Sequence, residues 1–111
     1  MKNEYSIIIT TVSNKKSAKV IAELLIQKRL AACVQMFPIE SIYFWKEKIC
    51  EDNEIILLIK SKSILFDKIS ATIKEKHEYE TPEIIQVPVT AGLSSYLNWI
   101  DNFVENRKII L

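Results

Sequence analysis

The feature that most constrains this chain is the run IILLI at residues 55–59, whose five consecutive apolar side chains must be removed from water. It is far shorter than the roughly 18 apolar residues that a membrane-spanning helix needs. Within its flanks it reads EIILLIK, and a short, nearly continuous apolar run is typical of a strand covered on both faces. We therefore expect a long strand with both faces covered.

The segment before this strand predicts a strand and a helix. YSIIITTV, at residues 5–12, is rich in β-branched side chains and predicts a buried strand. Ser13 or Asn14 follows and can cap a helix, because such side chains accept hydrogen bonds from the free N–H groups of a first turn. Apolar residues then recur at helical spacing: Ala18, Ile21, Ala22 and Leu25.

Four further elements are expected. LAACVQMFPIESIYFW is predicted to be extended, with Pro38 at a bulge, a bend or an edge because proline cannot donate to a central ladder. Ser63 begins a second helix, whose apolar side carries Leu65, Ile69 and Ile73. EIIQVPV, at residues 83–89, predicts another strand. Ser94 or Ser95 is expected to cap a short last helix, which bears Tyr96, Trp99, Ile100 and Phe103.

The resulting order, β-α-β-β-α-β with one more helix, predicts a single α+β domain over residues 1–111 with a ferredoxin-like fold. Its sheet is expected to be antiparallel, with the two main helices on one face. One short terminal helix cannot cover the other face, and monomers rarely expose large apolar patches. We therefore expect the chain to associate with copies of itself.

Composition excludes several classes of function. The net charge is +1, from 15 basic and 14 acidic residues, which gives no reason to expect nucleic acid as a partner. Gly92 is the only glycine, so the glycine-rich phosphate-binding loops are excluded. The start MKNEYSIIITT has too short an apolar region for a secretory signal, and no membrane anchor is evident. We expect a cytoplasmic protein.

The segment HEYETPE holds the only histidine, His77, close to several carboxylates. The second helix should end here, because Pro82 disfavours helical backbone at Thr81. A histidine at a helix end can simply bond free carbonyls. A metal site is the alternative, but the second histidine of a zinc-protease helix is absent, and Glu80 shares a face with His77 only if the helix continues.

Tyr43, Phe44 and Trp45 form an aromatic cluster on the extended segment. Strand aromatics stack on bases in RNA-recognition domains of this topology. The glycine- and aromatic-bearing signature of those domains is missing, so we expect these rings to pack in the core or between subunits.

Three motifs in this order resemble the divalent-cation tolerance protein CutA family: LAACV, S-x-Y-x-W at residues 41–45 and H-x-Y-x-x-P-E-I at residues 77–84. The resemblance covers practically the whole chain. It implies a ferredoxin-like fold packed as a homotrimer, a cytoplasmic role in the response to copper and other divalent cations, and a likeness to PII-type signal proteins. It implies no established catalytic activity.

Departures from the family concern metal binding and one turn. Some members are assigned a cysteine at the end of the first strand and two adjacent histidines as copper ligands, and this chain has Thr10, Lys76 and His77 at those positions. Lysine and threonine do not replace these soft ligands. We therefore expect no required cofactor and at most weakly bound copper or zinc, with His77 and Glu80 as ligands. The family's usual glycine in the turn after Trp45 is replaced by Glu47.

Three hypotheses for function follow. The first is a non-enzymatic, trimeric CutA-like protein of the metal-ion response. The second is a PII-like signalling module with a small molecule in the cleft between subunits, where Lys60, His77, Tyr79 and Glu83 converge. The third is an enzyme that uses the same groups for acid–base chemistry.

Overall fold

The computed structural model describes residues 4–105 of the 111-residue chain. Its elements are, in order, β1 (Tyr5–Val12), α1 (Lys15–Gln27), β2 (Cys33–Trp45), β3 (Lys48–Lys62), the 3-10 turn η1 (Ser63–Leu65), α2 (Phe66–Lys76), β4 (Ile84–Val89) and α3 (Ser94–Phe103). This order confirms the predicted ferredoxin-like arrangement with an additional helix. No helix in this part of the chain is long and apolar enough to cross a membrane.

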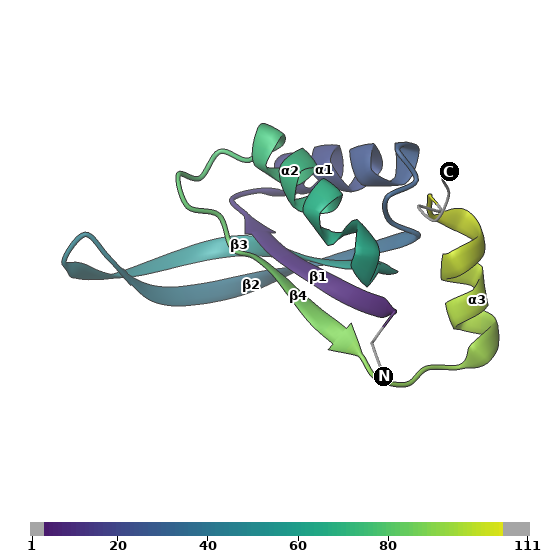
Figure 1. Cartoon of the computed structure of the whole chain (residues 1–111). Helices are drawn as coiled ribbons and strands as arrows, with labels where there is room; N and C mark the ends of the chain where they lie inside the picture. Colours follow the sequence, from purple (N-terminus) through teal and green to yellow (C-terminus); the bar gives the residue numbers. More distant parts are fainter. Residues whose placement is uncertain (1–3, 106–111) are drawn as a thin grey trace.

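The four strands form one antiparallel sheet in the order β2-β3-β1-β4. Figure 1 shows α1 and α2 side by side on the same face of this sheet. The core lies between the two layers, and its fully buried side chains include Ile8, Ile21, Leu25, Leu57, Ile59, Leu65, Ile69 and Ile73. The apolar residues that the sequence assigned to both helices are therefore in the core.

The helix ends agree with the sequence in two cases and differ in two. Helix α2 begins at Phe66, after the 3-10 turn η1, and not at Ser63 as predicted. Asn14 caps α1, because its side chain accepts a hydrogen bond of 2.8 Å from the backbone nitrogen of Ser17. Helix α2 ends at Lys76, and His77 is already extended. The serine cap predicted for α3 is wrong, because Leu93 occupies the N-cap position without a side-chain bond and Ser94 lies inside the first turn.

Strands β2 and β3 continue beyond the rest of the sheet as a two-stranded arm, residues 39–54, which pair only with each other. Figure 1 shows this arm projecting from the body. Pro38 pairs with Ile55 in an unbroken register, so it occupies the edge strand β2 without a bulge. The arm closes in a two-residue turn at Lys46 and Glu47, with φ of 51° and 68°, as a type I′ turn requires.

The expectation that EIILLIK is covered on both faces is wrong within the single chain. Leu57 and Ile59 point to the helices and are fully buried, whereas Ile56 and Leu58 on the opposite face are only half-buried. Helix α3 reaches this side only near Lys60 and Lys62, at the end of β3. The rest of this face has no second layer among residues 4–105.

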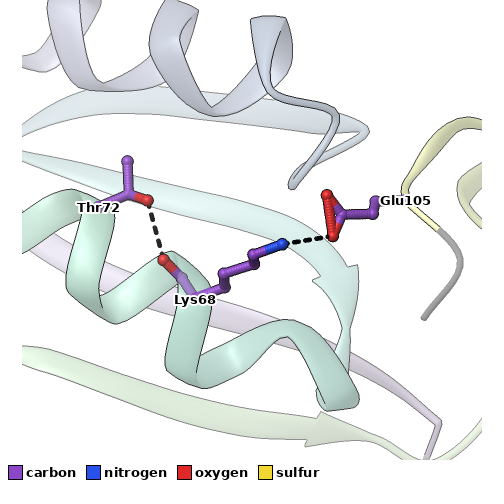
Figure 2. A network of polar contacts seen from close by, with 3 residues as sticks. All are labelled: Lys68, Thr72 and Glu105. Carbon is purple, nitrogen blue, oxygen red and sulfur yellow. Dashed lines mark hydrogen bonds and ion pairs between the residues drawn. The ribbon is translucent and has the colours of Figure 1, made fainter.

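Contacts after the end of α3 tie it to the helix layer. Figure 2 shows Lys68 of α2, whose Nζ lies 2.8 Å from Oε1 of Glu105. On the same helix, the Thr72 hydroxyl donates a hydrogen bond of 2.9 Å to the carbonyl of Lys68. The backbone nitrogen of Glu105 donates to the carbonyl of Arg29, at 2.7 Å. The chain end of α3 is thereby fixed to α2 and to the segment that follows α1.

Candidate functional site

A cavity of about 720 Å³ lies between the arm and the connection from α2 to β4. This connection runs beside the point where β2 and β3 leave the sheet (Figure 1). The cavity is lined by Thr11 of β1, by Glu40, Ser41, Ile42, Tyr43, Trp45, Asp52 and Glu54 of the arm, and by Tyr79, Glu80, Thr81 and Glu83 of the connection. Its volume is that of a small-molecule site.

Tyr79 and Glu54 join the two walls of the cavity. The Tyr79 hydroxyl donates a hydrogen bond of 2.7 Å to Oε2 of Glu54. Glu54 is only 8% exposed. Burial raises the pKa of Tyr79 well above its usual value, and the bond to Glu54 raises it further. Tyr79 is therefore a neutral hydrogen-bond donor at physiological pH.

A second phenol–carboxylate pair lies further along the arm. Tyr43 and Asp52 are diagonal neighbours on one face, because Tyr43 pairs with Cys50 across the strands. The Tyr43 hydroxyl donates to Oδ2 of Asp52, and this bond is the main reason that its pKa is raised to about 12. Both phenols are thus oriented by carboxylates of β3.

Both ring nitrogens of His77 make hydrogen bonds. Its Nε2 lies 2.8 Å from the carbonyl oxygen of Thr11 and must donate, because a carbonyl only accepts. Its Nδ1 then accepts a hydrogen bond of 3.2 Å from the backbone nitrogen of Tyr79. The two rings lie 4.8 Å apart between centroids. His77 therefore fastens the connection to β1 and orients Tyr79.

The positions that the family resemblance assigns to copper do not form a three-ligand centre in this chain. Thr10 is fully buried, and Lys76 is exposed at the end of α2. Both nitrogens of His77 are already engaged in hydrogen bonds. Within residues 4–105, no group of three or more His, Cys, Asp or Glu side chains is arranged to hold a metal ion. The residues present do not fit such a centre.

The predicted site residues separate into two places. Tyr79, Glu80 and Glu83 all line the cavity, and His77 lies next to Tyr79. Lys60 does not line it; its Nζ lies over the ring of Tyr96 of α3, 5.8 Å from the ring centroid. The single chain thus brings two of the four predicted cleft residues, Tyr79 and Glu83, to one cavity together with Glu80, which was predicted as a metal ligand. His77 lies at the edge of this cavity, beside Tyr79.

The sequence analysis missed the wall that the arm contributes, namely Glu54, Asp52 and Tyr43 as binding residues. Part of this wall could be predicted, because alternate residues of a strand share a face, which puts Asp52 and Glu54 on one side of β3. Bringing Tyr43 to that side requires the register of the hairpin, and the register depends on the exact position of the turn.

Comparison with known proteins identifies the family. A model of the CutA1 divalent ion tolerance protein matches residues 6–103. The divalent-cation tolerance protein CutA of Archaeoglobus fulgidus is 38% identical over 101 residues, which are 91% of this chain and 99% of that protein. The crystal structure of CutA1 from Shewanella sp. SIB1 has a TM-score of 0.92 and 36% identity, covering 96% of this chain and 100% of that chain. The chain belongs to the CutA1 divalent ion tolerance protein family.

Some relatives are considerably longer. Protein CutA of Mus musculus is 42% identical over 102 residues, 91% of this chain. The chain spans only 55–58% of the length of this protein and of the CutA proteins of Arabidopsis thaliana, Oryza sativa and Homo sapiens. The similarity therefore concerns one region of these longer proteins.

Proposed function

We propose that this chain acts in tolerance of divalent cations, copper among them, as a non-enzymatic cytoplasmic homotrimer. The observation that carries this proposal is family membership over residues 6–103, nearly all of the described chain. Relatives from Archaeoglobus fulgidus and Thermus thermophilus are named divalent-cation tolerance proteins.

A growth experiment tests this role. The chain is expressed in a bacterial strain from which its own family member has been deleted, and growth is followed at rising copper concentration. Restored growth supports the proposal. Unchanged sensitivity, with the assembled protein present in the cells, contradicts it.

The uncovered sheet face supports the homotrimer. Phe37 and Ile85 lie on this face and are 49% and 48% exposed, and Ile49 near the tip of the arm is 76% exposed. Apolar surface of this extent favours association, and closed symmetry leaves no open strand edge. We expect light scattering to give three times the chain mass of 12.9 kDa.

A charge on the uncovered face tests which surface assembles. Ile85→Asp should lower the measured mass, because a carboxylate is costly to bury between subunits. Val20→Asp is the matched control, since Val20 is 47% exposed but lies on α1 in the helix layer. Loss of assembly in the control alone would place the interface on the helices.

We further propose that copper(II) or zinc binds weakly at His77, with Glu80 as a second ligand. Weak binding follows from the hydrogen bonds of His77, because a metal must displace either the Thr11 carbonyl or the Tyr79 amide. Affinity should fall in acid, since imidazole must be deprotonated to bind a metal. In calorimetry, His77→Ala should abolish binding and Lys76→Ala should not. Tight binding that survives His77→Ala would contradict this assignment.

A PII-like small-molecule role is the second candidate. The cavity favours it, because Tyr79, Glu80 and Glu83 line a space of small-molecule size. In this candidate the ligand lies between subunits, and Lys60 reaches it from a neighbouring chain. A thermal-shift screen of metabolites tests it, since a ligand raises the Tm only if it binds the native state more tightly than the unfolded state.

A further inference from the structure

The connection between α2 and β4, residues 77–83, is fastened to β1 at both of its ends. At its start, Nε2 of His77 donates a hydrogen bond to the carbonyl of Thr11. At its finish, β4 begins at Ile84, which pairs with Thr10 in the sheet. Because the two anchors are adjacent residues of β1, the connection is a closed loop that is held against the sheet.

Tyr79 extends from this loop to the root of the arm. Val12 and Ile55 are the last pair that joins β1 to β3, so Glu54 is the first residue of the arm on β3 that has no partner on β1. The Tyr79 hydroxyl donates a hydrogen bond to Oε2 of Glu54, which is buried. Among residues 4–105, this bond is the one polar side-chain contact between the arm and the rest of the protein, since the other such contacts of the arm lie within it.

The arm needs a support at its root because only two strands form it. A two-stranded ribbon is marginally stable by itself and twists more than a wider sheet. From its first pair, Ile39 and Glu54, to its last, Trp45 and Lys48, the arm is about 20 Å long at the usual rise of a strand. A rotation of about 10° at the root would therefore move the tip by about 3.5 Å, which is roughly the spacing of one residue along a strand.

Both faces of the arm carry exposed apolar side chains. Tyr43 and Trp45 lie on the same face of β2 as Phe37 and continue the uncovered sheet face toward the tip. On the opposite face, Phe44 pairs with Ile49 across the strands. Burial of the uncovered sheet face between copies of the chain, as proposed above, takes the arm into the same interface. The direction of the arm then determines which residues of the neighbouring copy its side chains meet.

We propose that Tyr79 is a clamp that fixes the direction of the arm before the subunits assemble. Glu54 is the acceptor, and His77 is a positioning residue, because it ties the loop that carries Tyr79 to β1. The clamp favours assembly by preorganisation, since an arm that is already held in place loses less conformational freedom when it binds a neighbour. Its effect on assembly rests on the proposed homotrimer, whereas its hold on the root of the arm does not.

Hydrogen exchange in the assembled protein tests the clamp itself. Tyr79→Phe removes only the hydroxyl, and we expect the paired amides of residues 53–55 to exchange at least about tenfold faster. Exchange in α1 should not change, which separates the loss of a clamp from a general loss of stability. Tyr43→Phe is the matched control, because it removes a phenol–carboxylate bond that lies wholly within the arm. Unchanged exchange at the root in Tyr79→Phe, or an equal change there in Tyr43→Phe, would overturn the proposal.

A conservative variant separates the hydrogen bond from the charge. Glu54→Gln keeps a side-chain carbonyl that accepts from Tyr79, so we expect exchange at the root to stay within about threefold of the wild type. If Glu54→Gln exchanges as fast as Tyr79→Phe, the charge of Glu54 and not its bond to Tyr79 holds the arm, and the clamp is refuted.

Light scattering measures the consequence for assembly. In urea at which the wild type is partly dissociated, we expect Tyr79→Phe to raise the protein concentration of half-dissociation by at least about tenfold, and Tyr43→Phe to leave it nearly unchanged. Equal dissociation of Tyr79→Phe and the wild type would contradict a role in assembly. A wild type that is monomeric without urea would contradict the proposed homotrimer and not the hold on the arm, which the exchange experiment decides.

Discussion

The side chain of Thr10 lies in the interior with an unsatisfied hydroxyl. Its Oγ1 has no hydrogen-bond partner among residues 4–105, and Leu57 and Ile84 flank it on the neighbouring strands. A buried hydroxyl that has lost its bonds to water destabilises the native state. At the position that the family resemblance links to a metal ligand, this chain thus has a hydroxyl that makes no hydrogen bond within residues 4–105 and has no contact with water.

Thr10→Val should therefore stabilise the protein, by about 1–2 kcal/mol, because valine keeps the shape and removes the unpaired hydroxyl. Thr72→Val is the control, since the Thr72 hydroxyl is also buried but bonds the carbonyl of Lys68. We expect the control to lose about 0.5–1.5 kcal/mol. Urea titrations measure both, and a destabilising Thr10→Val would imply that the hydroxyl has a partner in the assembled protein.

Tyr79 makes stability depend on pH in the alkaline range. Its pKa is raised in the folded state by burial and by Glu54, so above pH about 10 the unfolded chain loses this proton first. The native state then holds more protons than the unfolded state, and stability falls as pH rises. The contribution is complete below pH about 10 and is lost progressively above it.

Tyr79→Phe should reduce this alkaline loss, because phenylalanine has no proton to release. Denaturant titrations between pH 8 and 11 measure the slope, and Tyr96→Phe serves as the control, since Tyr96 is exposed on α3. An unchanged slope in Tyr79→Phe would contradict the raised pKa.

Among the elements, the turn of the arm has a backbone that is unfavourable for its residues. Lys46 and Glu47 both have positive φ, where a side chain costs about 1–2 kcal/mol relative to glycine. The hairpin keeps this geometry because the twist of a type I′ turn matches that of the strands. Long pairing between β2 and β3 outweighs the local cost.

Glu47→Gly should stabilise the protein by about 0.5–1 kcal/mol, the relief of strain less the extra freedom of glycine in the unfolded chain. The control Glu51→Gly should lose a similar amount, because Glu51 lies in a regular strand where glycine only adds freedom. Thermal unfolding of both variants decides. If Glu47→Gly and Glu51→Gly both lower the stability, the positive φ at Glu47 carries no strain.

The elements themselves were predictable from the sequence, and their placement in the site was not. Helical periodicity identified both main helices, and runs of β-branched or apolar residues identified the four strands. The cap of α3 was missed because Ser94 and Ser95 are good caps locally, whereas the chain enters that helix at Leu93. The pairing of Tyr79 with Glu54 could not be predicted, since it depends on how a loop meets a strand far away in the sequence.

At the scale of the whole molecule, one layer of helices covers a sheet whose other face is largely open. If this face is buried between subunits, folding and association are coupled, and the Tm must rise with protein concentration. We expect this rise for the wild type and its absence in Ile85→Asp. A Tm of the wild type that stays constant over a hundredfold range of concentration would indicate a stable folded monomer.

The order of the strands also has a consequence for the time course of folding. Strand β2 pairs with β3 from Trp45 and Lys48, which only two residues separate in the sequence. Strand β1 joins β4 by pairing Tyr5 with Val89, which are far apart in the sequence. Short loops close far more readily than long ones, so the arm forms early and the central strand β1 is inserted late. During that interval, β3 has a free edge on which β1 will later pair. A nascent chain is then most exposed to capture by the wrong strand, and the speed with which β1 docks decides how many chains reach the native sheet.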